Sequence, residues 1–264
     1  MASSNVLSMT ELSTHASAQH TAFAGVRKEY HTHHSQSLQR NMEMLVFGQS
    51  GARVIAFPTA MGRFHDWEDH GLIAALRQHL EKGWIQLFCV DSVDGESWCD
   101  QQKSPAERAK RHSQYDRYIL NEILPLSAKI NGNPFLIVAG ADLGAYHAVN
   151  FSFRHPQAVG RVIGMSGYYD IKRHTGGYSD DEVYFNNPCD FMLHEHDRER
   201  LEAIRHLDIV LVTGRKDSGC ENNEYLSRIL WEKNIWHALR IWNGSAHDWA
   251  FWAQMLTLYI GGHD

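Results

Sequence analysis

The segment from residue 134 to residue 150 constrains the fold of this chain more than any other. Its sequence is PFLIVAGADLGAYHAVN, in which a short apolar run leads through a Gly-x-x-x-Gly turn into an alanine-rich stretch of helical character. Such a strand-to-helix turn is typical of a nucleophile elbow, whose apex is strained and whose neighbours two positions away must be small. Gly140 and Gly144 meet this requirement, and the apex between them is Asp142.

Length and composition favour one large α/β domain. The chain has 264 residues, and 43% of them are hydrophobic, which is enough for a sizeable core. We expect residues 1–25, which show no periodicity, to form a poorly ordered arm, and residues 26–264 to form the domain. The net charge of −6 argues against a surface for nucleic acid or for anionic membranes. A small molecule is therefore the expected ligand.

The cysteines and the apolar runs indicate a cytoplasmic protein. The four cysteines contain no Cys-x-x-Cys pair, and no run reaches the ~18 apolar residues of a membrane span. His31 and His33 belong to a histidine cluster without a carboxylate or cysteine at ligand spacing, so we interpret the cluster as a solvated strand edge. We expect no metal and no cofactor, and the sequence leaves a homo-oligomer open.

The rest of the chain alternates strands with helices. We predict strands over residues 26–33, 40–47, 53–58, 84–90, 134–139, 159–165, 207–213 and 236–242. Helices are predicted over residues 72–82, 106–129 and 221–234, with a last helix that ends near residue 260. The first two strands suggest an antiparallel hairpin, and the others predict a mostly parallel sheet with helices on both faces. The polar loop 91–98 should border the ligand cleft, and the segment 170–207 should be an insertion that shapes it.

Three candidate residues follow the carboxyl ends of predicted strands in the order Asp142, Asp217 and His247. This is the order of nucleophile, acid and histidine in α/β-hydrolases. Histidine can accept and return a proton near neutral pH, and an acid behind it fixes the tautomer. The loop 59–61 follows another strand and can direct backbone N–H groups at a developing anion.

The segments that carry these residues resemble the esterases of the esterase D-like branch of the α/β-hydrolase superfamily. The likeness spans about residues 26–262 and lies in GADLGAYHAVN from residue 140, FPTAMGRF from 57, TGRKD from 213 and AHDW from 246. It implies an α/β-hydrolase fold with His247 as general base and Asp217 as its orienting acid. It assigns the oxyanion hole to four backbone amides, those of Leu143, Thr59, Ala60 and Met61. Asp142 stands where the family has its serine.

Asp142 leaves several functions open. Attack of a carboxylate on an ester carbonyl would give a more reactive mixed anhydride, so serine-type esterolysis is disfavoured. At an sp³ carbon the carboxylate would form an alkyl-enzyme ester, which water activated by the histidine would cleave. Haloalkane dehalogenases and epoxide hydrolases of the superfamily use an aspartate in this way, but Leu143 offers no side-chain donor for a halide. The chain could also be a catalytically silent ligand-binding or regulatory protein, or an engineered Ser→Asp form of an active esterase.

Overall fold

The computed structural model describes residues 20–23 and 25–262. Most of the expected N-terminal arm, residues 1–25, lies outside these residues. Within the arm, His20–Phe23 forms strand β1, which pairs antiparallel with β2 (Val26–Ser35). The sheet therefore begins earlier in the chain than the expected boundary at residue 26.

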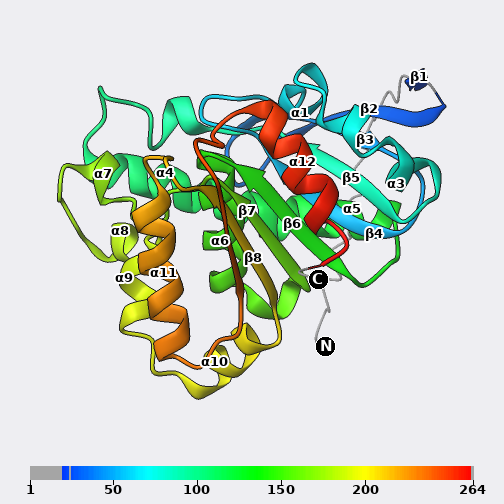
Figure 1. Cartoon of the computed structure of the whole chain (residues 1–264). Helices are drawn as coiled ribbons and strands as arrows, with labels where there is room; N and C mark the ends of the chain where they lie inside the picture. Colours follow the sequence, from blue (N-terminus) through cyan, green and yellow to red (C-terminus); the bar gives the residue numbers. More distant parts are fainter. Residues whose placement is uncertain (1–19, 24, 263–264) are drawn as a thin grey trace, which may run out of the picture.

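The described residues form one sheet of nine strands in the order β1-β2-β3-β5-β4-β6-β7-β8-β9 (Figure 1). The strands after β2 are β3 (Arg40–Phe47), β4 (Ala52–Phe57), β5 (Ile85–Val90), β6 (Leu136–Ala141), β7 (Arg161–Met165), β8 (Asp208–Gly214) and β9 (Ala238–Trp242). The pairs from β1 to β5 through β2 and β3 are antiparallel, and every pair from β5 to β9 is parallel. The predicted hairpin and mostly parallel sheet are confirmed. Strand β6, which leads to Asp142, lies in the interior of the sheet between β4 and β7.

Helices cover both faces of this sheet (Figure 1). The α-helices are α1 (Asp66–Asp69), α2 (Leu72–Ala75), α3 (Arg77–Glu81), α4 (Pro105–Tyr118), α5 (Leu124–Ile130), α6 (Leu143–Arg154), α7 (Lys172–Thr175), α8 (Asp181–Phe185), α9 (Pro188–Leu193), α10 (Arg198–Arg205), α11 (Cys220–Glu232) and α12 (Trp249–Tyr259). Side chains that alternate along β4 point to opposite faces. Ile55 and Phe57 join the core that includes α4, α6 and α11, whereas Val54 and Ala56 join the core that includes α1–α3 and α12.

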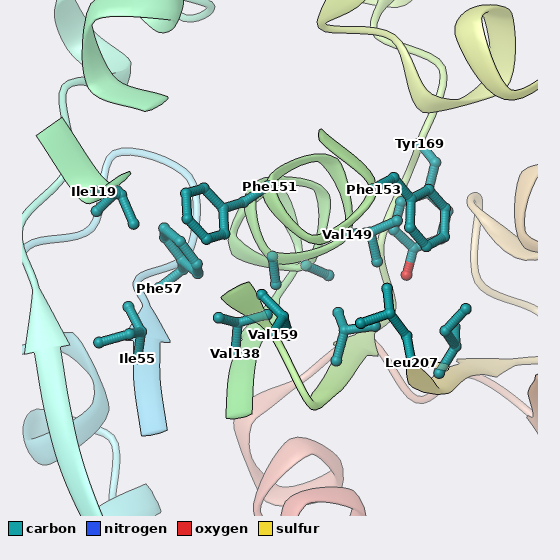
Figure 2. Close-up of a cluster of buried hydrophobic side chains, with 14 of the residues drawn as sticks. Ile55, Phe57, Ile119, Val138, Val149, Phe151, Phe153, Val159, Tyr169 and Leu207 are labelled. Carbon is teal, nitrogen blue, oxygen red and sulfur yellow. The ribbon is translucent and has the colours of Figure 1, made fainter. Parts of the chain in front are cut away.

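Helix α6 is buried along almost its whole length because it lies against the central strands. Figure 2 shows Phe151 of this helix beside Phe57 of β4, with Val138 of β6 below them, and Val149 beside Tyr169. This packing fixes the direction in which the chain leaves β6. The position of the apex at Asp142 is therefore determined by the core below it.

Two predicted helices differ in detail from the structure. The helix expected over residues 72–82 is divided into α2 and α3 at the buried Leu76, whose φ of −89° and ψ of 5° depart from α-helical values. The helix expected over 106–129 is α4, a π-helical turn (Ile119–Ile123) and α5. The segment between β7 and β8 contains the four short helices α7–α10.

Within the part of the chain that the structure describes, no helix combines the length and the apolar character needed to cross a membrane.

Candidate active site

Asp142 occupies a sharp turn between β6 and α6. Its backbone has φ 55° and ψ −122°, a region that residues with a side chain rarely adopt. The turn needs both flanking glycines. A Cβ on Gly140 would lie 2.2 Å from the carbonyl carbon of Gly144, and a Cβ on Gly144 would lie 2.3 Å from the carbonyl oxygen of Pro58. The close approach of strand and helix therefore presents the Asp142 side chain at the carboxyl end of the sheet.

The two carboxylate oxygens of Asp142 have different partners. Oδ2 accepts the N–H of Ala60 at 3.1 Å, and Oδ1 lies 3.5 Å from Nε2 of His247. Burial raises the pKa of Asp142, but His247 and the amides of Ala60 and Leu143 together outweigh burial and hold this pKa below its usual value. The site therefore favours an ionised carboxylate.

His247 responds in the opposite direction. The Asp142 carboxylate, 3.5 Å from Nε2, is the main cause that raises the pKa of His247 above its ordinary value, and burial only partly opposes this. The two side chains are 33% and 39% exposed for Asp142 and His247, so a ligand can reach both from solvent. The structure thus brings the predicted apex and the predicted histidine together as an ion pair.

The amides of the loop 59–61 have three different acceptors, so the predicted oxyanion hole is only partly correct. Ala60 donates to the carboxylate at the apex, as predicted. The N–H of Thr59 donates to Oδ2 of Asp66 at 2.9 Å, and the N–H of Met61 donates to Oδ2 of Asp94 at 3.3 Å. The assignment of Thr59 and Met61 to the hole is wrong, because these nearer carboxylates take their N–H groups. The amides of Ala60 and Leu143 are the donors that act on the apex.

Asp217 follows β8 as predicted, but we find no hydrogen bond from the His247 ring to it among the described residues. Its carboxylate accepts five others, from the N–H groups of Ala246 and Gly214 at 2.7 Å each, and from the hydroxyls of Ser166, Ser245 and Thr213 at 3.1, 3.2 and 3.3 Å. The role of orienting acid implied a direct hydrogen bond to His247, and the structure does not form it, because these donors occupy both oxygens. Asp217 instead holds the backbone of the residue that precedes His247.

The sequence did not reveal the role of Ser166. This buried residue follows β7 with φ 49°, donates to Asp217, and accepts the indole N–H of Trp252 at 3.1 Å. It therefore ties the Asp217 carboxylate to α12, whose first turn follows His247. In the sequence, Ser166 is visible only as part of a Ser-Gly pair directly after a buried strand, and this pair does not indicate which residues the hydroxyl will contact.

The volume of a surface groove does not identify the active site in this structure. A groove of about 880 Å³ is lined by residues of α10 and its neighbours, from Glu195 to His206 and from Glu232 to Asn234. None of its lining residues contributes to the pair of Asp142 and His247. We identify the site from its chemistry, which is an ion pair at the carboxyl ends of parallel strands.

The fold and the site define an α/β-hydrolase. Residues 35–259 match the model of a family described as "Putative esterase". Because the match covers most of the chain, this protein belongs to that esterase family. A search of curated proteins finds no match to the sequence.

Solved structures agree with this fold. A ferulic acid esterase matches with a TM-score of 0.72 at 16% identity, over 88% of this chain and 96% of its own. An S-formylglutathione hydrolase from Agrobacterium tumefaciens matches with a TM-score of 0.73 at 12% identity, over 92% and 96% of the two chains. An S-formylglutathione hydrolase from Staphylococcus aureus matches with a TM-score of 0.65 at 13% identity, over 96% and 98%. At these identities the likeness shows the α/β-hydrolase fold alone.

Proposed function

We propose that this protein is an esterase-type hydrolase that binds small carboxylic esters at Asp142 and His247, with Asp142 at the reacting position. One observation carries the proposal, namely that Asp142 presents one oxygen to the amide of Ala60 and the other to Nε2 of His247. Membership of the esterase family supports an ester as the ligand. Asp217 supports the loop of His247 through the backbone of Ala246.

Ordinary esters should react slowly at this site. The carbonyl oxygen of an ester needs the amides of Ala60 and Leu143 in the transition state, but Asp142 already uses them. Losing a single such donor costs about 10²–10³ in kcat. A site without its nucleophile can still accelerate hydrolysis about 10³-fold over water, so weak esterase activity is consistent with the proposal.

A comparison of Asp142→Ser with Asp142→Asn on one aryl ester tests this function. Serine frees the two amides and places a hydroxyl near His247, so we expect a gain of about 10²-fold or more and a burst of product. Asparagine matches aspartate in size and has no nucleophilic oxygen, so we expect no burst. If Asp142→Ser gains nothing, a catalytically silent protein is favoured. If the wild type hydrolyses the ester rapidly and Asp142→Asn leaves this rate unchanged, another residue carries the reaction.

The different partners of the two Asp142 oxygens, Ala60 for Oδ2 and His247 for Oδ1, also favour a second candidate function, which is hydrolysis at an sp³ carbon. Oδ1 of Asp142 would form a bond to that carbon while the leaving group departs with the bonding electron pair. A water that gives its proton to His247 would then attack the carboxyl carbon of Asp142. The negative charge would pass to Oδ2, beside the amide of Ala60, and collapse would release an alkoxide that takes the proton back from His247.

The raised pKa of His247 fits this order of events. Asp142 is the main cause of the raised pKa, and alkylation would remove its negative charge. His247 would then lose its proton more readily and become the base that the second step requires. Intact-mass spectrometry after incubation with epoxides and alkyl halides tests this candidate. We expect a covalent adduct in the wild type that Asp142→Asn lacks, and no adduct in either protein would exclude this candidate.

A further inference from the structure

We propose that Asp94 and His147 are a positioning pair that sets the oxyanion loop, which we define as residues 59–62. The inference rests on the proposed function, since it gives the pair a role relative to the reacting group at the apex. Both residues act through the backbone of the loop. Neither was singled out from the sequence as a site residue.

The loop is held by a regular pattern of contacts. Three successive amides, those of Thr59, Ala60 and Met61, donate to Asp66, Asp142 and Asp94 over 2.9, 3.1 and 3.3 Å. The amide of Gly62 then closes the turn onto the carbonyl of Thr59 at 2.9 Å. The middle contact is the one that faces the reacting position, and the two outer carboxylates hold the loop on either side of it.

Met61 is the strained member of this loop. Its φ is 60°, which is uncommon for a residue with a side chain, and the residue is 61% exposed. An exposed side chain contributes little packing to hold such a backbone, so the conformation depends on what binds the backbone. The N–H of Met61 donates to Asp94, and this bond fixes the peptide that joins Met61 to Ala60. Loss of the bond should let the amide of Ala60 move away from the apex.

Asp94 needs a partner to remain in place. It is 2% exposed, and a buried carboxylate is costly unless it is hydrogen-bonded. Its Oδ1 lies 2.9 Å from Nε2 of His147, and the two side chains are each 1% exposed. This contact selects the tautomer in which Nε2 donates. Asp94 thus uses one oxygen for His147 and the other for Met61.

His147 lies on α6, the helix that begins directly after the apex. Its ring stacks on His112 with centroids 5.2 Å apart and meets Tyr115 edge-on at 5.4 Å. The ring is therefore fixed by packing, and α6 sets its distance from the apex. The pair connects the elbow helix to the oxyanion loop. The amide of Ala60 and the Asp142 side chain are therefore both positioned relative to α6.

Stability alone does not account for this pair. Buried polar pairs are often replaceable by apolar residues of similar volume with little loss of stability. Their value lies in fixing one arrangement, and here the fixed arrangement is the direction of an oxyanion donor. Interactions of this kind matter most in the transition state, so they should affect kcat more than KM.

Two substitutions at one position separate geometry from packing. His147→Phe keeps a ring but removes the donor to Asp94, whereas His147→Gln keeps an N–H donor of similar reach. In the Asp142→Ser background we expect His147→Phe to lower kcat about 10-fold or more with KM within about 3-fold. We expect His147→Gln in the same background to keep kcat within about 3-fold of that of Asp142→Ser alone. Equal kcat values for Asp142→Ser and for its His147→Phe and His147→Gln derivatives would overturn the proposal.

Hydrogen exchange of the loop amides tests the pair without any activity. In the chain with Asp142 intact, His147→Phe should speed exchange at Met61 and Ala60 about 10-fold or more, while Thr59, which is bound to Asp66, stays unchanged. Unchanged exchange at Met61 and Ala60 would overturn the proposal. If Asp142→Ser proves inactive, the proposed function fails, but this measurement still decides the role of the pair.

The wild-type protein provides a further measurement should His147→Phe fail to fold. An amide bound to buried Asp94 should be protected from exchange, so Met61 should exchange about 10²-fold more slowly than in an unstructured peptide. An unprotected Met61 amide would contradict the proposal in the same way.

Discussion

Asp142 and Asp217 follow parallel strands of one sheet, yet their surroundings differ. Asp217 is 7% exposed and accepts five hydrogen bonds, two of them from backbone amides at 2.7 Å. The Asp142 side chain is 33% exposed, and its Oδ1 faces His247 across 3.5 Å. A carboxylate whose oxygens are both hydrogen-bonded, such as that of Asp217, supports the surrounding backbone, and we call it the brace. A carboxylate with one oxygen facing a histidine and solvent, such as that of Asp142, can react with a ligand. The two acids therefore differ in role because different hydrogen-bond donors surround them, although both follow a parallel strand.

The largest effect should come from closing the elbow. Gly144→Ala places a Cβ 2.3 Å from the carbonyl oxygen of Pro58, which cannot move without moving the end of β4. We expect a loss of about 3 kcal/mol or more in the free energy of unfolding, measured with urea. Gly132→Ala is the matched control, because no atom lies within 4 Å of its added Cβ. Equal stability of the two variants would contradict the described contact between strand and helix.

The same change at the two acids should give unequal results. Asp217→Asn offers one acceptor oxygen where two are used, so its NH₂ must face the amide of Ala246 or that of Gly214. We expect a loss of about 2 kcal/mol in unfolding free energy. Asp142→Asn can keep its oxygen toward Ala60 and turn its NH₂ to His247, so we expect a change below about 1 kcal/mol. A larger loss at Asp142 than at Asp217 would reverse our assignment of brace and reacting group.

The sequence predicts one of these regions better than the other, for a physical reason. The elbow depends on a local pattern, since Gly140 and Gly144 flank the apex and the strand before them is apolar. The donors to Asp217 include Ser166 and Ala246, which lie far away in the chain and meet it only after the sheet has formed. Spacing along the chain indicates that an acid is present. It does not indicate how many donors will surround that acid.

The same limit applies to the loop 59–61. The pattern around the loop predicts backbone amides near the apex, and the amide of Ala60 donates to Asp142. Which amide turns to which carboxylate depends on Asp66 and Asp94, whose positions are set by tertiary packing.

Removing the Ser166 hydroxyl should have an intermediate effect on the brace. Ser166→Ala takes one donor from Asp217 and leaves the indole N–H of Trp252 without its acceptor. We expect a loss of about 1–2 kcal/mol in unfolding free energy. Ser50→Ala is the control, because Ser50 is exposed and donates only over 3.4 Å. A Ser166→Ala protein as stable as this control would show that the hydroxyl does not support the region.

The smallest effect concerns the dependence of stability on pH. The pKa of His247 is raised, so its contribution is complete below about pH 6.5 and is lost as pH rises through the folded value. The pKa of Asp142 is lowered, so its contribution is complete above about pH 3.9 and is lost as pH falls through the folded value. The stability difference between wild type and Asp142→Asn should therefore be largest between about pH 4 and pH 6.5. Both side chains are about one-third exposed, so we expect less than about 1 kcal/mol. A difference that grows above this range would contradict the ion pair.

The most direct test is an NMR titration of the His247 ring in the wild type and in Asp142→Asn. With eighteen histidines in the chain, the spectrum of His247→Gln would identify the resonance. We predict a wild-type pKa for His247 above the ordinary value of about 6.5, because the ionised Asp142 carboxylate faces its Nε2. In Asp142→Asn the pKa should fall to about 6.5 or below, since burial then acts without the opposing charge. The same His247 pKa in both proteins would contradict a carboxylate paired with this histidine at the reacting position.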